Sequence, residues 1–339
     1  MTQLLVDPAP GVDRIDDPRW RDLVDALTRR ELFGAAAGLA AMGMLSACGG
    51  TESAPGAEAS AASTREVTTP LGTYDIPVRP SRVIAVDSRV DLELALALGL
   101  PVIGHNHSEA RPWLPLTPQV KYLSEKPNLE QILALQPDLI ICANEGGEWW
   151  PADKLLKIAP VLTTDFRVDW RENLTVLAAW LGVPDKGKQL IAGYQTHLDG
   201  IKALHADLIP TAKVCALSYL ESTGNIYITS TRDPARGPLP TEMTLHDLGG
   251  VTSAAKFDAP ENALSLERLD LIADSDGFML NGSQQDYDAL MSNRLWQKLP
   301  AVKKGMVTLL EGDVYFGSVF TMPKVADGWS DLYTKIAAG

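Results

Sequence analysis

The chain has 339 residues, which is long for one hydrophobic core and fits two α/β lobes of roughly 100–150 residues each. Hydrophobic residues make up 45% of it and charged residues 22%, as is ordinary for a globular protein. The formal net charge is −13 and no run of Lys or Arg occurs, which excludes nucleic acid as an expected partner, because phosphate neutralisation needs clustered basic side chains.

Residues 1–47 are predicted to be a signal peptide. Arg29 and Arg30 precede the apolar, small-residue segment Gly34–Leu45, and Leu45-Ser46-Ala47-Cys48 follows. This order is typical of an export signal rather than of a membrane-spanning helix. The arginine pair resembles a twin-arginine signal, and the last four residues resemble a bacterial lipobox, in which Cys48 would be lipidated. The alternative is a short hydrophobic helix with an incidental cysteine.

A flexible tether is predicted at residues 48–65. Gly49–Thr64 is rich in Gly, Ala, Ser and Glu and too poor in large apolar side chains to fold. The folded part is expected to comprise an N-terminal lobe at 66–168, a helical connector at 169–210 and a C-terminal lobe at 211–339.

Short apolar runs that alternate with helical segments predict the N-terminal lobe. Strands are expected at 82–86, 101–104, 139–142 and 161–164. A β-hairpin is expected near Pro70–Pro77, and a helix at Asp87–Leu98 that ends at Gly99, because glycine suits the left-handed residue after a helix.

The stretch Asn128–Ile141 predicts a capped helix that leads into a buried strand. The Asn128 side chain can accept from one of the first helical amides. Leu129, Ile132, Leu133 and Leu135 supply an apolar stripe. Pro137 disfavours helix, and Leu139–Cys142 is uniformly apolar, as in a parallel strand buried on both faces.

The connector and the C-terminal lobe continue the same alternation. A helix is expected at Asp169–Leu181, and a second one at Asp185–Leu208, on the order of 35 Å long, which Pro210 stops. Strands follow at 213–219 and 226–228, and a helix at Met243–Leu248. The predicted fold class is α/β, with two Rossmann-like lobes of mostly parallel sheets joined by a single long helix.

A partial copy of the capped stretch occurs at Leu264–Leu280, with Glu267 near the start of its expected helix. Two copies in one chain favour two similar lobes. Cys142 and Cys215 each lie in an apolar, strand-like run, and this context favours buried free thiols over a disulfide.

Several of these pieces, read in order, resemble the ferric-siderophore/vitamin B12 type of substrate-binding protein of ABC importers. They are Arg82–Ile84, Leu98-Gly99, Asn128–Ile141, Glu267 and Leu295–Val307. The resemblance covers about residues 67–338. It implies two α/β lobes joined by one long helix, a ligand in the cleft between them, and a membrane permease as the partner.

The resemblance also implies two docking carboxylates, one on each lobe, which correspond here to Glu130 and Glu267. A carboxylate on a first helical turn is favoured by the helix dipole and can meet an arginine of the permease. The alternative is that each is a solvated glutamate favoured only by its position in a helix.

Ligands of open α/β sheets bind beyond the carboxyl ends of the strands, and the loops expected there are rich in Arg and aromatic residues. A ferric catecholate or citrate complex carries negative charge, which Arg suits, and flat rings, which Trp and Tyr suit. The expected ligand contacts are Arg89, His105, His107, Arg111, Trp113, Asn144, Trp149, Trp150, Arg167, Tyr219, Arg232, Arg236 and Asn281. The alternative for any one arginine is a surface charge.

The sequence does not favour a metal site or an enzyme. His105 and His107 lack the third and fourth ligands of a zinc site, so at most an auxiliary contact to the ligand is expected from them. No Gly-x-Ser-x-Gly and no glycine-rich phosphate loop occurs.

The prediction is an extracytoplasmic, monomeric protein without a cofactor, anchored through Cys48 to the outer face of the cytoplasmic membrane. It binds an iron(III)–siderophore complex and delivers it to an ABC permease. The alternatives are a haem or corrinoid carrier and, more distantly, a lipid-anchored enzyme.

Overall fold

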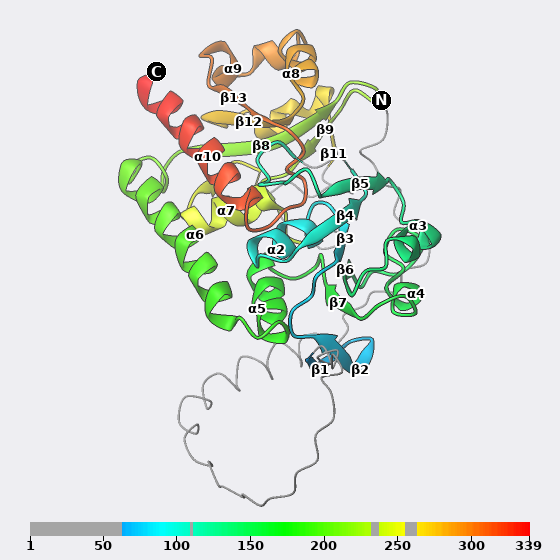
Figure 1. Cartoon of the computed structure of the whole chain (residues 1–339). Helices are drawn as coiled ribbons and strands as arrows, with labels where there is room; N and C mark the ends of the chain where they lie inside the picture. The colour runs from blue at the N-terminus through cyan, green and yellow to red at the C-terminus, as the bar shows by residue number, and fades with distance from the viewer. Residues whose placement is uncertain (1–62, 109–110, 232–236, 255–262) are drawn as a thin grey trace, which may run out of the picture. The chain divides into compact units, whose positions relative to one another are not determined.

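The computed structural model describes residues 63–108, 111–231, 237–254 and 263–339 (Figure 1). The predicted signal peptide, Cys48, nearly all of the tether, Arg232 and Arg236 lie outside the described residues. Residues 62–339 form one compact unit with its own sheets and cores. Among the described residues, no helix is both long and apolar enough to cross a membrane.

The compact unit begins with a small hairpin. β1 (Thr64–Thr69) pairs antiparallel with β2 (Gly72–Pro77), and the pairing runs from Thr64 opposite Pro77 to Thr69 opposite Gly72. This confirms the predicted hairpin, and places the start of folded structure within the last two residues of the expected tether.

The N-terminal lobe, called the N-lobe below, is built on a five-stranded sheet in the order β5-β4-β3-β6-β7. Its strands are β3 (Val83–Asp87), β4 (Val102–Asn106), β5 (Lys121–Ser124), β6 (Leu139–Ala143) and β7 (Val161–Thr164). Every described pair in it is parallel. The uniformly apolar runs are the buried strands, as expected for a parallel sheet covered on both faces.

The N-lobe helices are α2 (Asp91–Ala97), α3 (Leu129–Ala134) and α4 (Ala152–Leu155). Asn128 caps α3 as predicted, since its side chain accepts from the amides of Glu130 and Gln131 at 3.0 and 3.1 Å. One member of the predicted apolar stripe is wrong. Leu133 is 57% exposed, because this six-residue helix buries mainly the face that carries Ile132.

Two helices connect the lobes. α5 (Trp170–Trp180) is followed by α6 (Pro184–Leu204), whose 21 residues span about 32 Å. α6 contacts α5, α7 and α10, and it leads from α5 to the start of the second sheet (Figure 1). The single long connecting helix is therefore present, although it ends at Leu204 rather than at the predicted Leu208.

The C-terminal lobe, called the C-lobe, has a sheet in the order β11-β9-β8-β12-β13, and β10 also pairs with β8. The strands are β8 (Lys213–Leu220), β9 (Asn225–Ile228), β10 (Val251–Thr252), β11 (Ala263–Ser265), β12 (Gly277–Gly282) and β13 (Val307–Glu311). β8, β10, β12 and β13 run parallel, whereas β9 is antiparallel to both β8 and β11.

The predicted copy of the capped helix in the C-lobe is wrong in detail. Leu264 lies in β11, and the segment with Glu267 is a 3₁₀ helix, η3 (Leu266–Ile272), with non-helical dihedral angles at Arg268. Ser265 makes no capping hydrogen bond through its side chain, unlike Asn128. The remaining helices are α7 (Pro240–Leu248), α8 (Gln284–Met291), η4 (Trp296–Lys298), α9 (Pro300–Lys303) and α10 (Thr321–Ala338).

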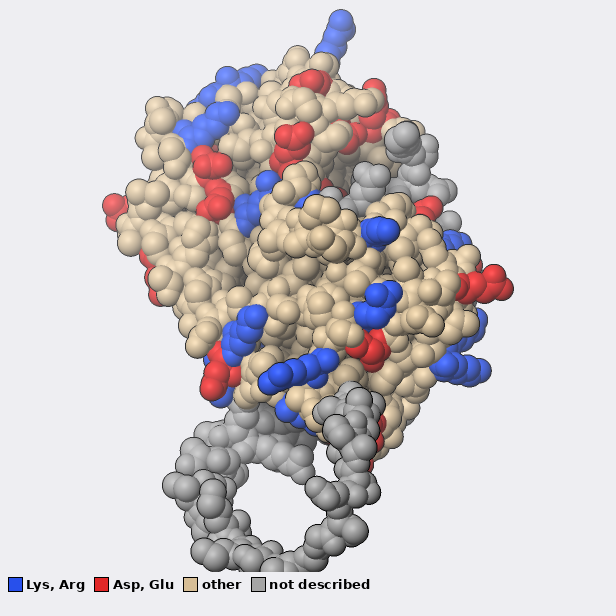
Figure 2. All heavy atoms as spheres, in the orientation of Figure 1, with Lys and Arg blue, Asp and Glu red and all other residues tan. Residues whose placement is uncertain are grey.

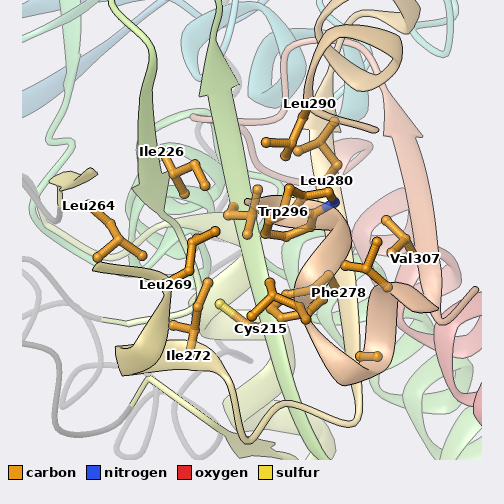
Figure 3. Packing of buried hydrophobic residues seen from close by; sticks show 14 of the residues in the cluster. Cys215, Ile226, Leu264, Leu269, Ile272, Phe278, Leu280, Leu290, Trp296 and Val307 are labelled. Carbon is orange, nitrogen blue, oxygen red and sulfur yellow. The ribbon is translucent and has the colours of Figure 1, made fainter. Parts of the chain in front are cut away.

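Each lobe has its own hydrophobic core. In the C-lobe core, Phe278 and Trp296 pack with their ring centroids 4.7 Å apart, and Cys215 lies beside them (Figure 3). Cys142 belongs to the N-lobe core. Both thiols are buried and free, which confirms the expectation for these two cysteines.

The surface carries mixed charge. On the face drawn in Figure 2, Lys and Arg are scattered among Asp and Glu rather than gathered into one basic patch. This distribution agrees with the mixed acidic and basic composition and the net charge of −13.

Candidate functional site

Aromatic side chains gather at the carboxyl ends of the N-lobe strands. His107 follows β4 and stacks on Trp149 and Trp150, with centroids 5.3 and 5.1 Å away. Trp150 packs against Phe166, which follows β7, at 5.3 Å. Phe166 in turn lies 5.2 Å from Phe316, which follows β13 of the C-lobe. These five residues are called the aromatic cluster, and it joins the two lobes ring to ring.

Arg89 and Asp87 form the polar part of the cluster. The Arg89 guanidinium lies 4.9 Å from the Phe316 centroid and 5.8 Å from that of Phe166, and its Nη2 is 2.7 Å from Asp87 Oδ2. Trp150 Nε1 donates to the same oxygen at 3.1 Å. Burial alone would raise the pKa of the Asp87 carboxyl, but Arg89 more than offsets it and holds this pKa well below its usual range.

His107 is a neutral member of the cluster. Burial lowers the pKa of its imidazole, although Asp87 Oδ2 lies 3.7 Å from its Nε2. The same nitrogen is 3.2 Å from the carbonyl oxygen of Trp149. A neutral ring stacked between two indoles provides an apolar wall rather than a charge.

A second buried carboxylate, Asp91, holds the strand ends in place. It accepts from the amides of Asp87 and Ala143 at 2.9 and 3.2 Å and from Thr164 Oγ1 at 2.6 Å. These bonds link β3, β6 and β7 directly beneath the cluster. Burial, together with the charge of Asp87, raises the pKa of Asp91 to about 7. Our sequence reasoning missed Asp91, although an acid in a largely apolar helical stretch was visible.

Glu93 and Arg111 form a buried ion pair within the N-lobe, and both residues bind C-lobe backbone; we call the pair the Glu93–Arg111 anchor. Arg111 Nη1 lies 3.2 Å from Glu93 Oε1. Its other nitrogens donate to the C-lobe carbonyls of Asp313 and Phe316 at 2.7 and 2.8 Å. Glu93 Oε2 accepts from three C-lobe amides at 2.9–3.1 Å, those of Ser318, Phe320 and Thr321. The anchor thus fixes the segment after β13 to the N-lobe.

Arg167 is also paired. Its Nη2 lies 3.0 Å from Glu145 Oε2, and Asp165 is close to both. Burial and the neighbouring Asp165 raise the pKa of the Glu145 carboxyl. Of the arginines predicted to contact the ligand, the three that the structure describes therefore all pair with protein carboxylates.

Other predicted site residues lie outside the aromatic cluster. Trp113 donates to Thr321 Oγ1 at 3.2 Å and lines a pocket of about 550 Å³ beside β13 and α10. His105 is buried 5.7 Å from the ring of Tyr122. Tyr219 packs against the C-lobe core, and buried Asn281 accepts from Thr229 Oγ1 at 3.0 Å.

The structure thus brings Arg89, His107, Trp149 and Trp150 together. Asn144 is half-buried directly after β6, in the loop that leads to the tryptophans, and its amide donates to the carbonyl of Thr164 at 2.9 Å. In the described part of the chain, no group of three or more His, Cys, Asp and Glu is placed to hold a metal ion.

The two predicted docking carboxylates lie on different lobes and both are exposed. Glu130 is in the first turn of α3. Glu267 borders a pocket of about 390 Å³ that Leu266, Leu295 and Lys298 also line. Their role in docking stays a prediction.

Comparison with known proteins places this architecture among binding proteins. A family model described as "Periplasmic binding protein" matches residues 83–314. The chain is 30% identical over 286 residues to the probable siderophore-binding lipoprotein YfiY of Bacillus subtilis, covering 79% of this chain and 86% of that protein. It is 26% identical over 293 residues to the ferric enterobactin-binding periplasmic protein FepB of Escherichia coli, covering 79% and 91%.

The fold is also similar to solved structures. A periplasmic solute binding protein from Mycobacterium smegmatis superposes with a TM-score of 0.65 at 21% identity, covering 80% of this chain and 98% of that one. At this identity the likeness speaks for the fold, and it agrees with the two sheets described above.

Proposed function

Because the chain belongs to the periplasmic binding protein family, we propose that it binds an iron(III)–siderophore complex outside the cytoplasm and delivers it to the permease of an ABC importer. The observation that carries this proposal is the aromatic cluster, where Phe166 of one lobe meets Phe316 of the other. Ligands of open α/β sheets bind at such carboxyl strand ends. The names of the two relatives described above, each matched over 79% of this chain, support an iron chelate rather than haem or a corrinoid.

The protein acts by binding alone. The cluster offers stacked rings and closely paired charges, which suit the capture and orientation of a bulky chelate. The chelate is not changed chemically, so the site selects its ligand through differences in binding free energy.

The protein is held at the membrane through a lipid on Cys48 and works as a monomer. The lipobox-like Leu45–Cys48 supports the anchor, as does the lipoprotein name of one relative. The exposed Glu130 and Glu267 are the contacts to the permease, one from each lobe.

Tryptophan fluorescence titration of residues 62–339 tests the binding step. Trp149 and Trp150 stack on His107 in the cluster, so ferric siderophores are expected to quench the emission as they bind. Trp149→Phe should lose much of this quenching, whereas Trp113→Phe, a tryptophan outside the cluster, should keep most of it. If no ferric siderophore produces saturable quenching or heat in calorimetry, the proposed function is wrong.

A further inference from the structure

The charges around the aromatic cluster are unusual for a site that would bind an anion. Among the described residues, six carboxylates lie on or next to three guanidinium groups. The arginines are Arg89, Arg111 and Arg167, and the acids are Asp87, Asp91, Glu93, Glu145, Asp165 and Asp313. Even with Asp91 protonated, the acids outnumber the arginines.

Each of the three arginines already compensates at least one protein carboxylate, so its charge is largely balanced before a ligand is considered. The Asp87 side chain is fully buried, so moving Arg89 away would leave a carboxylate without its partner inside the protein. Arg111 is 4% exposed and donates to Glu93 and to three carbonyl oxygens. Arg167 is the most exposed of the three at 32%, and it faces both Glu145 and Asp165.

The rest of the wall is apolar. His107 is held neutral by burial, and Trp149, Trp150, Phe166 and Phe316 present rings. Such a wall contributes contact area to a ligand of any charge, but it does not stabilise negative charge that has been removed from water.

We propose that the chelate bound here has a neutral iron centre, that of a ferric tris-hydroxamate, and that the site disfavours ferric tris-catecholates and citrates. This inference rests on the proposed function. Three hydroxamates each bring one negative charge and neutralise iron(III), whereas three catecholates bring two each and leave three negative charges in excess. The sequence alone favoured the anionic chelates, because it showed the arginines without their partners.

Arg232 and Arg236 are the two predicted ligand arginines outside the described residues. The segment that carries them rejoins the described chain at Gly237, where an added Cβ would lie 2.7 Å from the carbonyl oxygen of Phe166. The contribution of these two cations is therefore tested with a double variant, which is described with the titrations below.

Calorimetric titration of residues 62–339 tests this inference by comparing the dissociation constants of a hexadentate ferric tris-hydroxamate and a hexadentate ferric tris-catecholate. We expect the hydroxamate to bind at least about 100-fold more tightly, since like charges brought together at an interface cost several kcal/mol. Equal affinities, or tighter binding of the catecholate, would overturn this inference and leave the proposed function standing. Binding of neither chelate would overturn the proposed function itself.

A variant pair locates the effect. Glu145→Gln removes one negative charge beside Arg167 and should tighten tris-catecholate binding by about tenfold, with the tris-hydroxamate changing less than about twofold. Asp185→Asn removes the same charge at a side chain that is 88% exposed and paired with Lys188 at the start of α6, away from the cluster, and should change neither. Equal effects of the two variants would contradict a local charge balance. The double variant Arg232→Ala with Arg236→Ala should still bind the tris-hydroxamate. The inference fails if this variant loses that binding and if the unmodified protein binds the tris-hydroxamate with a steep dependence on salt, because binding would then depend on the two charges.

Discussion

Glu93→Gln tests whether the Glu93–Arg111 anchor holds the two lobes together. The substitution keeps the size of the side chain and removes its charge. Oε2 can remain an amide oxygen and accept from the amides of Ser318, Phe320 and Thr321. The new NH₂ group then replaces Oε1 and faces Arg111 Nη1, so two donors meet where an ion pair stood at 3.2 Å.

The expected loss of stability follows from the burial of the pair. Removal of one partner of a buried ion pair costs about 3–5 kcal/mol, because the other charge stays behind without compensation. Arg111 is 4% exposed but keeps its bonds to the carbonyls of Asp313 and Phe316, so we expect the lower end, about 3 kcal/mol. With an unfolding entropy of about 2.1 cal/mol/K per residue, that loss corresponds for residues 62–339 to a Tm lowered by about 5 °C.

Urea unfolding of residues 62–339, followed by circular dichroism, measures the effect. Glu148→Gln is the matched control, because its exposed pair with Lys126 is worth about 0–1 kcal/mol. Glu93→Gln combined with Arg111→Met should recover part of the loss, because no charge then remains buried without a partner. A loss for Glu93→Gln within about 1 kcal/mol of the control would refute the anchor.

Three further predictions concern pH, backbone space and docking. The pKa of Asp91 is raised to about 7, so between about pH 4 and about pH 7 the folded protein holds a proton that the unfolded chain has released, and stability falls as pH rises through this window. Asp91→Asn, which mimics the protonated form, should flatten that fall in urea unfolding at several pH values, and an unchanged slope would contradict the shift. Gly237→Ala should lower Tm more than Gly224→Ala, because both have positive φ but only the first would place Cβ against backbone, and equal losses would count against close packing there. Glu130→Ala with Glu267→Ala should leave chelate affinity within about twofold while abolishing uptake in cells, and normal uptake would show that docking lies elsewhere.

The sequence was informative where the physical cause is local. Asn128 caps α3 because a side chain two or three residues away can reach the first amides. The buried strands are readable because a parallel strand covered on both faces must be apolar throughout, as Leu139–Ala143 is. The C-lobe copy failed because a glutamate at a similar position does not make a helix without the cap, and Ser265 caps nothing with its side chain.

The candidate site could be predicted less well, because its charged side chains pair with residues that are distant in the chain. Glu93 accepts hydrogen bonds from the amides of Ser318 and Thr321, more than 200 residues away, and no local sequence pattern predicts contacts at that separation. Arg111 therefore looked available to a ligand, although the structure occupies its donors. Phe166 and Phe316 were not among the predicted ligand contacts for the same reason: their loops could be placed at the strand ends, but only the fold brings the two rings to 5.2 Å.

The anchor also determines which lobe controls the aromatic cluster. Phe316 follows a C-lobe strand, yet its carbonyl oxygen accepts from Arg111 and its ring packs on Phe166, and both of these belong to the N-lobe. The segment after Phe316 is bound to Glu93 through three backbone amides. Phe316 is thus positioned by N-lobe residues although the C-lobe sequence supplies it. Side chains that the protein holds in place lose less conformational freedom when a ligand binds, so Glu93→Gln is expected to weaken chelate affinity as well as to lower stability.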